Sequence, residues 1–364
     1  MSTEPASAGK PVVVYGASGY TGRLICEYLR EFNVPFVAAG RDKARIAGAL
    51  GQVPGLDTVE HEIVEVAHDV APLTELFSGA QVVCNTVGPF AQYGHEVVEA
   101  CASAGCHYLD TTGEQDWLIT CDEKYGATMA AKGLLLAPGI AQMYTTGEIA
   151  ACLCLETPGL DTLDILVFWK GFPTVASTRT ILVNAALAKA HYLEQNSYVE
   201  WPADGGLYDV VVPGQHETGL ALPWGGTSHP VWFKRDPRVA NVKVLGGVFN
   251  RALMQGVPQI VAAVLEQIEG LPEHEKLRVA RARTEGLGQH LRAEARPAHA
   301  EQHSVDEAGA GHLAGEGFQG GYVEAFATRG RQPAKPLSFL ATGPQASISG
   351  PQPPRPALGA RSFG

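Results

Sequence analysis

Along the first half of the chain, short apolar runs alternate with segments that carry apolar residues on one face only. Val12–Tyr15 is an unbroken apolar run, as expected for a strand buried on both faces of a parallel sheet. Between residues 24 and 32 the apolar positions recur at helical spacing. The same alternation continues to about residue 137. It predicts further strands at 35–39, 58–66, 80–84, 106–109 and 133–137, and helices at 24–32, 43–50, about 73–77, 95–104 and 115–132.

This order predicts an α/β fold with a Rossmann-type doubly wound parallel sheet and helices on both of its faces. Ligands of such sheets bind outside the carboxyl ends of the strands. We therefore assign the functional site to the turns that follow those ends, at 16–22, 40–43, 85–94, 110–114 and 138–146.

From about residue 157 the pattern changes to alternating strands separated by glycine-rich turns. Residues 162–171 alternate as a strand, and further strands are expected at 197–201, 207–212 and 230–234, with helices at 177–195 and 257–268. The pattern predicts a second, α+β domain with a mainly antiparallel sheet. The expected division is a flexible N-terminus at 1–10, a nucleotide-binding domain at 11–150, a substrate domain at 151–272 and an irregular, poorly ordered segment at 273–364.

That last segment is poor in large apolar residues, and its final part from Gln332 contains seven prolines. Such a composition buries little surface, which favours a mobile tail. A segment that is not ancestral, for instance through a shifted reading frame, is the alternative.

Composition narrows the class of protein. The 364 residues carry a net charge of −11, which argues against a nucleic-acid partner. No apolar run reaches the roughly 18 residues of a membrane span, and residues 1–10 do not resemble a signal peptide. The seven cysteines include no Cys-x-x-Cys pair, so we expect reduced thiols, no metal site and a cytoplasmic protein.

A glycine pattern stands between the first strand and the first helix. Gly16, Gly19 and Gly22 have the spacing of a dinucleotide-binding turn. Gly16 would make the tight turn, Gly19 would admit a pyrophosphate, and Gly22 would let the helix pack close to the strand. The alternative is an ordinary tight turn that binds no nucleotide.

The end of the second strand indicates which dinucleotide is bound. Arg41 occupies the position where NAD-binding proteins usually carry an acid, and Lys43 and Arg45 follow it. A guanidinium at this place suits the 2′-phosphate of NADP. Asp42 is either an acid for the ribose or the cap of the next helix. We predict NADP (NADPH) as the cofactor.

Two longer motifs lie at the ends of the fourth and fifth strands, with the sequences NTVGPFAQYG at 85–94 and YLDTTGE at 108–114. Together with GASGYTG and AGR, they resemble the saccharopine dehydrogenase-like oxidoreductase family, which includes saccharopine reductases and the mycobacterial trans-acting enoyl reductases. The resemblance covers about residues 11–150 and weakens after Pro138. It implies an NADP-binding first domain and a second domain over whose sheet substrate and nicotinamide meet. The cofactor contacts that it implies are Gly16, Ser18, Gly19, Tyr20, Thr21, Gly22, Arg41, Asn85, Thr86, Val87, Gly88, Pro89 and Phe90.

Hydride transfer usually needs a proton donor beside the nicotinamide. Tyr144 is the preferred candidate, and Tyr93, His95 and Asp110 are the others, because all four lie at predicted strand ends. Tyr93 and His95 have an alternative role as the start of a helix. Thr112 is expected to cap a helix, and Lys170 to be a surface residue.

Two other classes of oxidoreductase fit less well. No tyrosine has a lysine four residues on, as short-chain dehydrogenases need. Cys152 and Cys154, the candidate nucleophiles of an acyl-phosphate reductase, lie in an apolar helical run and so look like core residues. The sequence therefore predicts an NADP-dependent oxidoreductase that reduces a C=C, C=O or C=N bond of a small organic, lipid or polyketide-like substrate and forms a homodimer. The alternative is a non-catalytic NADP-binding sensor.

Overall fold

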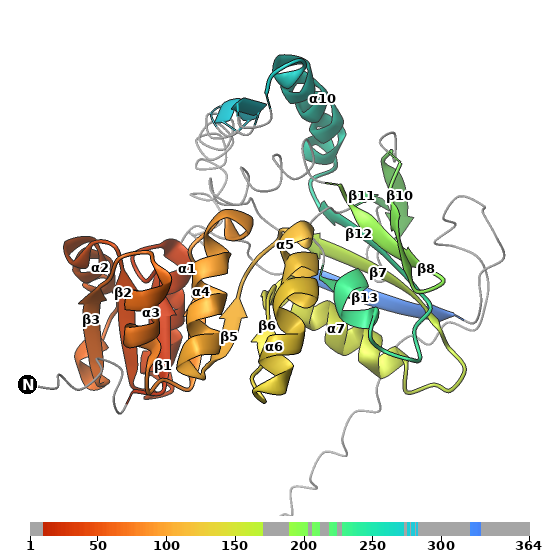
Figure 1. Ribbon diagram of the computed structural model, residues 1–364. Helices are drawn as coiled ribbons and strands as arrows, with labels where there is room; N and C mark the ends of the chain where they lie inside the picture. The colour runs from red at the N-terminus through yellow and green to blue at the C-terminus, as the bar shows by residue number, and fades with distance from the viewer. Residues whose placement is uncertain are drawn as a thin grey trace, which may run out of the picture.

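The computed structural model describes residues 10–169, 189–202, 206–211, 218–223, 228–272, 275–276, 278–280, 282 and 321–328. Two sheets stand beside each other in Figure 1. The first has six strands in the order β3-β2-β1-β4-β5-β6, and every neighbouring pair is parallel. Its strands are β1 (Val12–Tyr15), β2 (Phe36–Gly40), β3 (His61–Glu65), β4 (Val82–Asn85), β5 (His107–Asp110) and β6 (Leu136–Ala137). The predicted Rossmann-type sheet is confirmed.

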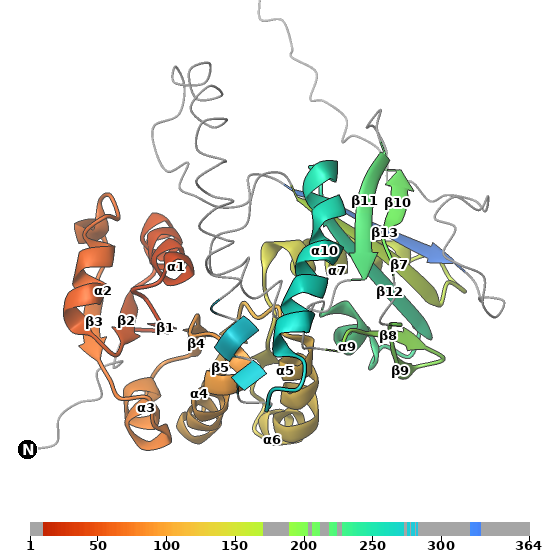
Figure 2. The same ribbon diagram turned by 90° about the horizontal axis from the view of Figure 1, so that it is seen from above.

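Helices cover both faces of this sheet, because successive residues of β1 and β2 point to opposite sides. Val12, Val14 and Phe36 pack in one core with residues of α1 (Tyr20–Glu31) and α2 (Lys43–Leu50). Val13 and Tyr15 belong to a second core, formed with α3 (Val70–Phe77) and α4 (Phe90–Ala104). Figure 2 shows α1 and α2 on one side of the strands and α3 and α4 on the other.

Several predicted boundaries in this domain are wrong. The expected strand at 58–66 begins only at His61, because Leu56–Thr58 forms a 3₁₀ turn, and the expected strand at 133–137 shortens to β6. The expected helix at 95–104 begins at Phe90. The expected helix at 115–132 is three segments: α5 (Gln115–Thr120), a π-helical turn (Cys121–Tyr125) and α6 (Gly126–Ala131).

The second sheet follows the order β10-β11-β12-β7-β13, and β8 joins β12 and β9. Among the described residues, all of its strand pairs are antiparallel except β7 with β12, so the predicted mainly antiparallel sheet is confirmed. Its strands are β7 (Thr162–Trp169), β8 (His191–Glu194), β9 (Ser197–Glu200), β10 (Tyr208–Val211), β11 (Thr218–Pro223), β12 (Asn241–Val248) and β13 (Gly321–Thr328). The helices beside it are α7 (Gln142–Cys154), α9 (His229–Phe233) and α10 (Arg251–Ile268).

The predictions for this half were less accurate. The expected strand at 230–234 is helix α9, whose early Pro230 suits the first turn of a helix. Residues 191–194 of the expected helix 177–195 are strand β8, and residues 177–188 lie outside the described residues. Helix α10 begins at Arg251, because the Asn250 side chain accepts a hydrogen bond from the Leu253 N–H.

Part of the segment expected to be irregular is regular: β13 pairs along its whole length with β7. Its apolar residues, Tyr322, Val323, Ala325, Phe326 and Ala327, form a short group inside a segment that is otherwise poor in large apolar residues. The N-terminus at 1–9, Lys170 and the tail from Gln332 lie outside the described residues. The expected domain boundary at residue 150 falls inside α7, whose Ala151 and Cys154 already pack in the core of the second sheet.

The two sheets are joined by polar contacts as well as by α7. The Gln115 side chain donates to the His191 carbonyl (3.0 Å) and accepts from the His191 N–H (2.7 Å). Arg235 and Asp122 form an ion pair between α9's end and the π-helical turn. Among the described helices, none is long and apolar enough to cross a membrane.

Candidate active site

The glycine turn needs glycine at two of its three motif positions. Gly16 has φ +94°, and a Cβ there would lie 2.6 Å from Thr86 Oγ1. A Cβ on Gly22 would lie 2.5 Å from the carbonyl oxygen of Gly16. A side chain at either position would clash with backbone or packed neighbours. Glycine at positions 16 and 22 therefore lets the loop fold tightly between β1 and α1.

Gly19 is different, because its surroundings are open. It is exposed, and a Cβ there would meet only the Gly16 carbonyl oxygen, at 3.3 Å. It is the N-cap of α1, and no side chain caps that helix. Ser18 precedes it, and Tyr20 and Thr21 are the first two residues of the helix. An uncapped helix start with an open approach is a suitable place for a phosphate group.

Arg41 lies beside this turn. The N–H groups of Gly16 and Ala17 both donate to the Ala39 carbonyl, at 2.8 and 3.2 Å, so the glycine turn rests on the end of β2. Arg41 follows two residues later and is exposed, as is Lys43. The Asp42 side chain accepts from the Arg45 N–H (2.9 Å), so the helix-cap alternative for this residue is the one that the structure supports.

The next turn uses its polar side chains internally. Asn85 is 1 % exposed; its amide donates to the Tyr108 hydroxyl (3.1 Å) and its carbonyl accepts from the Val87 N–H (3.0 Å). The Thr86 hydroxyl donates to the Tyr15 carbonyl (3.0 Å). The two side chains thus fix the path of the chain through Gly88, Pro89 and Phe90, and the backbone of the turn is what remains to contact a cofactor.

Asp110 is the centre of a buried hydrogen-bond network. It is 2 % exposed, and its carboxylate accepts from the Tyr108 hydroxyl (2.7 Å) and the Trp117 indole N–H (2.9 Å). It also accepts from the N–H groups of Thr112 (2.9 Å) and Gly139 (2.8 Å). Burial raises the pKa of Asp110, and the hydrogen bonds oppose this shift. The carboxylate therefore ties β5 to α5 and to the 138–140 turn, which is a positioning role.

Glu114 is also a positioning residue, and it connects the start of α5 with the start of α4. Its carboxylate accepts from the N–H groups of Phe90 and Ala91, both at 2.9 Å, and so caps α4 from another loop. This cap explains why α4 begins five residues earlier than expected. The expected capping by Thr112 takes the form of a turn: its hydroxyl accepts from the Glu114 N–H (3.0 Å), one residue before α5.

Tyr144 comes to the same place from α7. Its side chain is 3 % exposed, and its hydroxyl oxygen lies 3.2 Å from where a Cβ of Gly113 would be. The ring packs edge-on against His229, with centroids 6.1 Å apart, and His229 Nε2 bonds the Tyr144 carbonyl (2.9 Å). The preferred proton donor thus reaches the 110–114 turn at the carboxyl end of the sheet.

The other two candidates lie elsewhere. His95 Nδ1 bonds the Tyr125 hydroxyl (2.7 Å), and its ring packs on Trp117 with centroids 5.0 Å apart. Tyr93 packs edge-on against His68, with centroids 5.5 Å apart. The structure does not bring these side chains together with Tyr144. Both belong to α4 and pack against neighbouring elements, which agrees with the alternative interpretation that they are part of a helix.

Sequence reasoning missed two histidine sites. His68, which follows β3, bonds the Tyr15 hydroxyl through Nδ1 (2.7 Å), and burial raises the pKa of Tyr15 to about 12. His229 is fully buried, and burial lowers its pKa to about 4. The strand-end rule would have found His68, because it applies to β3 as to the other strands. His229 directly precedes the segment predicted as a strand at 230–234, so no pattern led to it.

The cysteines fit a core role. All seven are free; Cys154 is buried, and burial raises the pKa of Cys152, which disfavours a nucleophilic thiolate. Within the described part of the chain, no three histidine, cysteine or acidic side chains come together as metal ligands.

Comparisons with known proteins divide the chain into two parts. Residues 12–131 match the family model of the saccharopine dehydrogenase NADP binding domain. Residues 145–311 match a family of unknown function (DUF5938). The second match begins in α7, where the resemblance to saccharopine dehydrogenases weakens.

Curated relatives resemble the first part. A lipid droplet localized protein of Caenorhabditis elegans is 37 % identical over 132 residues, which are 34 % of this chain and 31 % of the relative. A trans-acting enoyl reductase of Mycobacterium ulcerans is 38 % identical over 105 residues, 28 % of this chain and 25 % of the relative. A human saccharopine dehydrogenase-like oxidoreductase is 32 % identical over 139 residues, 34 % and 32 % of the two chains.

The chain spans only about a quarter to a third of the length of these relatives. The family model that matches residues 12–131 names NADP as the ligand of this domain. Residues 12–131 thus form an NADP-binding domain of the saccharopine dehydrogenase type, which confirms both the resemblance and the cofactor that the sequence predicts.

Proposed function

We propose that this protein is an NADPH-dependent reductase that transfers hydride to a C=C, C=O or C=N bond of a small organic, lipid or polyketide-like substrate. The observation that carries the proposal is the open, uncapped start of α1 at Gly19, with the exposed Arg41 at the adjoining strand end. The first suits the diphosphate and the second the 2′-phosphate. The similarity to a trans-acting enoyl reductase supports C=C reduction as one of the three options.

In this proposal Tyr144 supplies the proton. Its hydroxyl lies at the 110–114 turn, and the 85–90 turn that follows the neighbouring strand β4 would hold the nicotinamide. A phenol there protonates the enolate, the alkoxide or the amine nitrogen that forms as hydride reaches a C=C, C=O or C=N bond. Asn85, Asp110 and Glu114 act as positioning residues, since their side chains hold the turns together. Tyr93 and His95 remain weaker candidates.

The test is consumption of NADPH by the purified protein with a panel of enones, ketones and imines, followed by absorbance or fluorescence. Turnover of at least one class, with NADH much less effective, is the expected result. A protein that binds no NADPH at all would refute the proposal.

A non-catalytic NADP-binding sensor is the second candidate. It is favoured by the observation that His95 and Asp110, two of the four candidate catalytic side chains, are engaged in internal contacts. Tight NADPH binding without turnover of any substrate class would support the sensor. A homodimer and a cytoplasmic location remain predictions.

A further inference from the structure

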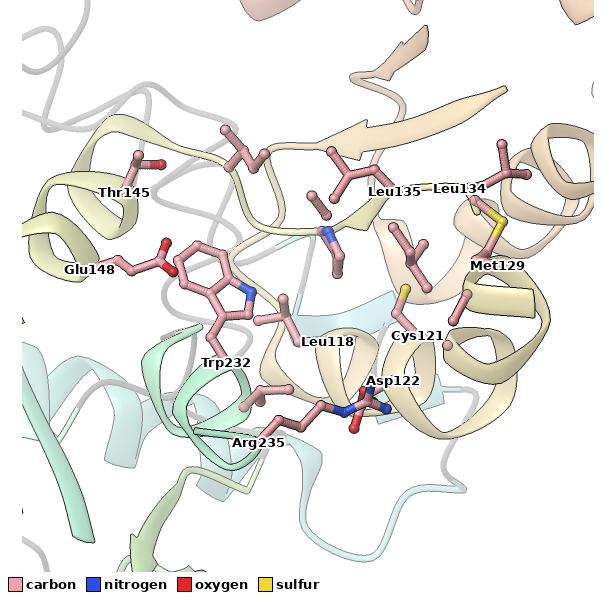
Figure 3. A pocket seen from close by; sticks show the side chains of 17 residues that line it. Leu118, Cys121, Asp122, Met129, Leu134, Leu135, Thr145, Glu148, Trp232 and Arg235 are labelled. Carbon is pink, nitrogen blue, oxygen red and sulfur yellow. Dashed lines mark ion pairs between the residues drawn. The ribbon is translucent and has the colours of Figure 1, made fainter. Parts of the chain in front are cut away.

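A cavity of about 460 Å³ lies at the outer side of β6, the edge strand on the opposite side of the sheet from β3. Its walls come from α5, the π-helical turn, α6, β6, the start of α7 and α9 (Figure 3). Pro138 and Ile140 line it, whereas the N–H of Gly139 between them donates to Asp110. One turn of the chain therefore separates this cavity from the buried network of the candidate active site.

Most of the wall is apolar and part of it is open to water. Leu118, Met129 and Leu136 contribute to it, and so do Leu135 and Ile140, which are 52 % and 39 % exposed. The volume lies in the range of small-molecule sites, roughly 300–1,000 Å³. A ligand with an alkyl chain would remove this apolar surface from water, which is favourable. The π-helical turn in the wall is a further sign, because such turns occur often at functional sites.

The other end of the cavity is polar and acidic. Figure 3 shows the Glu148 carboxylate beside the indole ring of Trp232. Partial burial raises the pKa of Glu148, and no cationic side chain in the described ranges pairs with it. Thr145 Oγ1 is buried and has no hydrogen-bond partner among the described residues. Arg235, the cation in the cavity wall, is already paired with Asp122.

The Glu148 carboxylate, the Thr145 hydroxyl and the Trp232 indole together have the chemistry of a binding site for an ammonium group. A carboxylate and a hydroxyl oxygen both accept hydrogen bonds, and the face of an indole attracts a cation. A primary ammonium carries three donors and no acceptor, so it can use all three groups. A carboxylate head would be repelled by Glu148, and an alcohol head would leave the Glu148 charge without a counterion.

We propose that this cavity binds a primary alkylamine, with its alkyl chain on the leucine-lined wall and its ammonium group on Glu148, Thr145 and Trp232. The site is distinct from the proposed hydride site and does not depend on the proposed function. Tyr144 and Thr145 are neighbours at the start of α7, yet one reaches the 110–114 turn and the other lines this cavity.

The test is isothermal titration of the full chain, without cofactor, with octylamine, octanol and octanoate at about pH 8, well above the usual pKa of a glutamate and below that of an alkylamine. We expect octylamine to bind at least about tenfold more tightly than octanol, the scale of one hydrogen bond to a charged group. Octanoate should bind most weakly. Glu148→Gln keeps the shape of the side chain and should abolish the preference of the site for the amine.

Glu123→Gln is the matched control, because Glu123 is exposed on the same π-helical turn as Asp122 and does not line the cavity. It should leave octylamine affinity unchanged. Equal affinities for octylamine and octanol, an equal loss in both variants, or no binding of any of the three probes would overturn the proposal. Melting temperatures and NADPH titrations of both variants show whether they fold. Since the amine titration needs neither cofactor nor turnover, a failure here is separable from a failure of the proposed reductase activity.

Discussion

The glycine turn (residues 16–22) and the turn at 110–114, here called the acidic turn, follow the ends of strands β1 and β5 of one sheet, yet they use their residues in opposite ways. At the glycine turn, Gly19 leaves the start of α1 uncapped and open. At the acidic turn, the buried carboxylates of Asp110 and Glu114 accept hydrogen bonds from the Tyr108 hydroxyl and from backbone N–H groups at the start of α4 and at Gly139. Polar residues at strand ends therefore serve either to bind a ligand or to hold the turns that bind it.

The largest effect is expected from breaking the acidic turn. Asp110→Ala would leave the Tyr108 hydroxyl, the Trp117 indole N–H and two backbone N–H groups without their acceptor. Each buried unpaired donor costs about 1–3 kcal/mol, and loss of a buried charged partner typically costs about 3–5 kcal/mol in all. We expect a loss of that size in the free energy of unfolding, measured with urea.

Asp57→Ala is the control, because Asp57 is exposed in the 3₁₀ turn, and it should change stability by less than about 0.5 kcal/mol. If Asp110→Ala were as stable as the parent protein, the hydrogen bonds that Asp110 accepts would not be what stabilises the acidic turn.

At the glycine turn we expect a substitution to weaken cofactor binding while stability is retained. Gly19→Val places a branched side chain where the diphosphate must lie, so NADPH affinity should fall at least about a hundredfold while the melting temperature stays close to that of the parent. Titration calorimetry and thermal unfolding measure the two quantities. Gly48→Val is the control, because a Cβ on Gly48 meets nothing within 4 Å and its helix is not the one that begins at Gly19. Parent affinity in Gly19→Val would place the diphosphate elsewhere.

A smaller effect is expected at Arg41, which distinguishes the two cofactors. Its exposed guanidinium adjoins the glycine turn, so Arg41→Ala should narrow the affinity gap between NADPH and NADH by about 1–3 kcal/mol, the scale of hydrogen bonds to charged groups. Lys10→Ala removes a positive charge just before β1, at the amino-terminal edge of the sheet, and should leave the gap unchanged. Equal affinities of the parent protein for both cofactors would contradict the assignment of Arg41.

The comparison also shows what the sequence can and cannot predict. The apolar runs and the glycine spacing predicted the parallel sheet and the turn between β1 and α1, because both depend on local pattern. The roles of Asn85, Asp110 and Glu114 depend on which loops meet, and so on contacts between residues far apart in the chain. The same holds for α4, which begins at Phe90 because Glu114, 24 residues later, caps it. In the second half, Pro230 at a helix start gave a weak local signal, and the short apolar group of β13 lies in a segment otherwise poor in large apolar residues.

The last prediction concerns Tyr144, the proposed proton donor. The Tyr144 hydroxyl lies over Gly113, at the acidic turn, and its ring is held by His229. If this phenol donates the proton, its removal should slow the chemical step, and loss of one general acid costs about 10²–10⁴-fold in many enzymes. We therefore expect Tyr144→Phe to lower turnover by at least about tenfold.

Phe keeps the ring on His229 and removes only the hydroxyl, so NADPH affinity and melting temperature should change little. Tyr28→Phe, at an exposed position on α1, is the matched control and should turn over like the parent. A drop in melting temperature with normal turnover would make Tyr144 a packing residue of the acidic turn, like Asp110. The proton would then come from Tyr93, from His95 or from water.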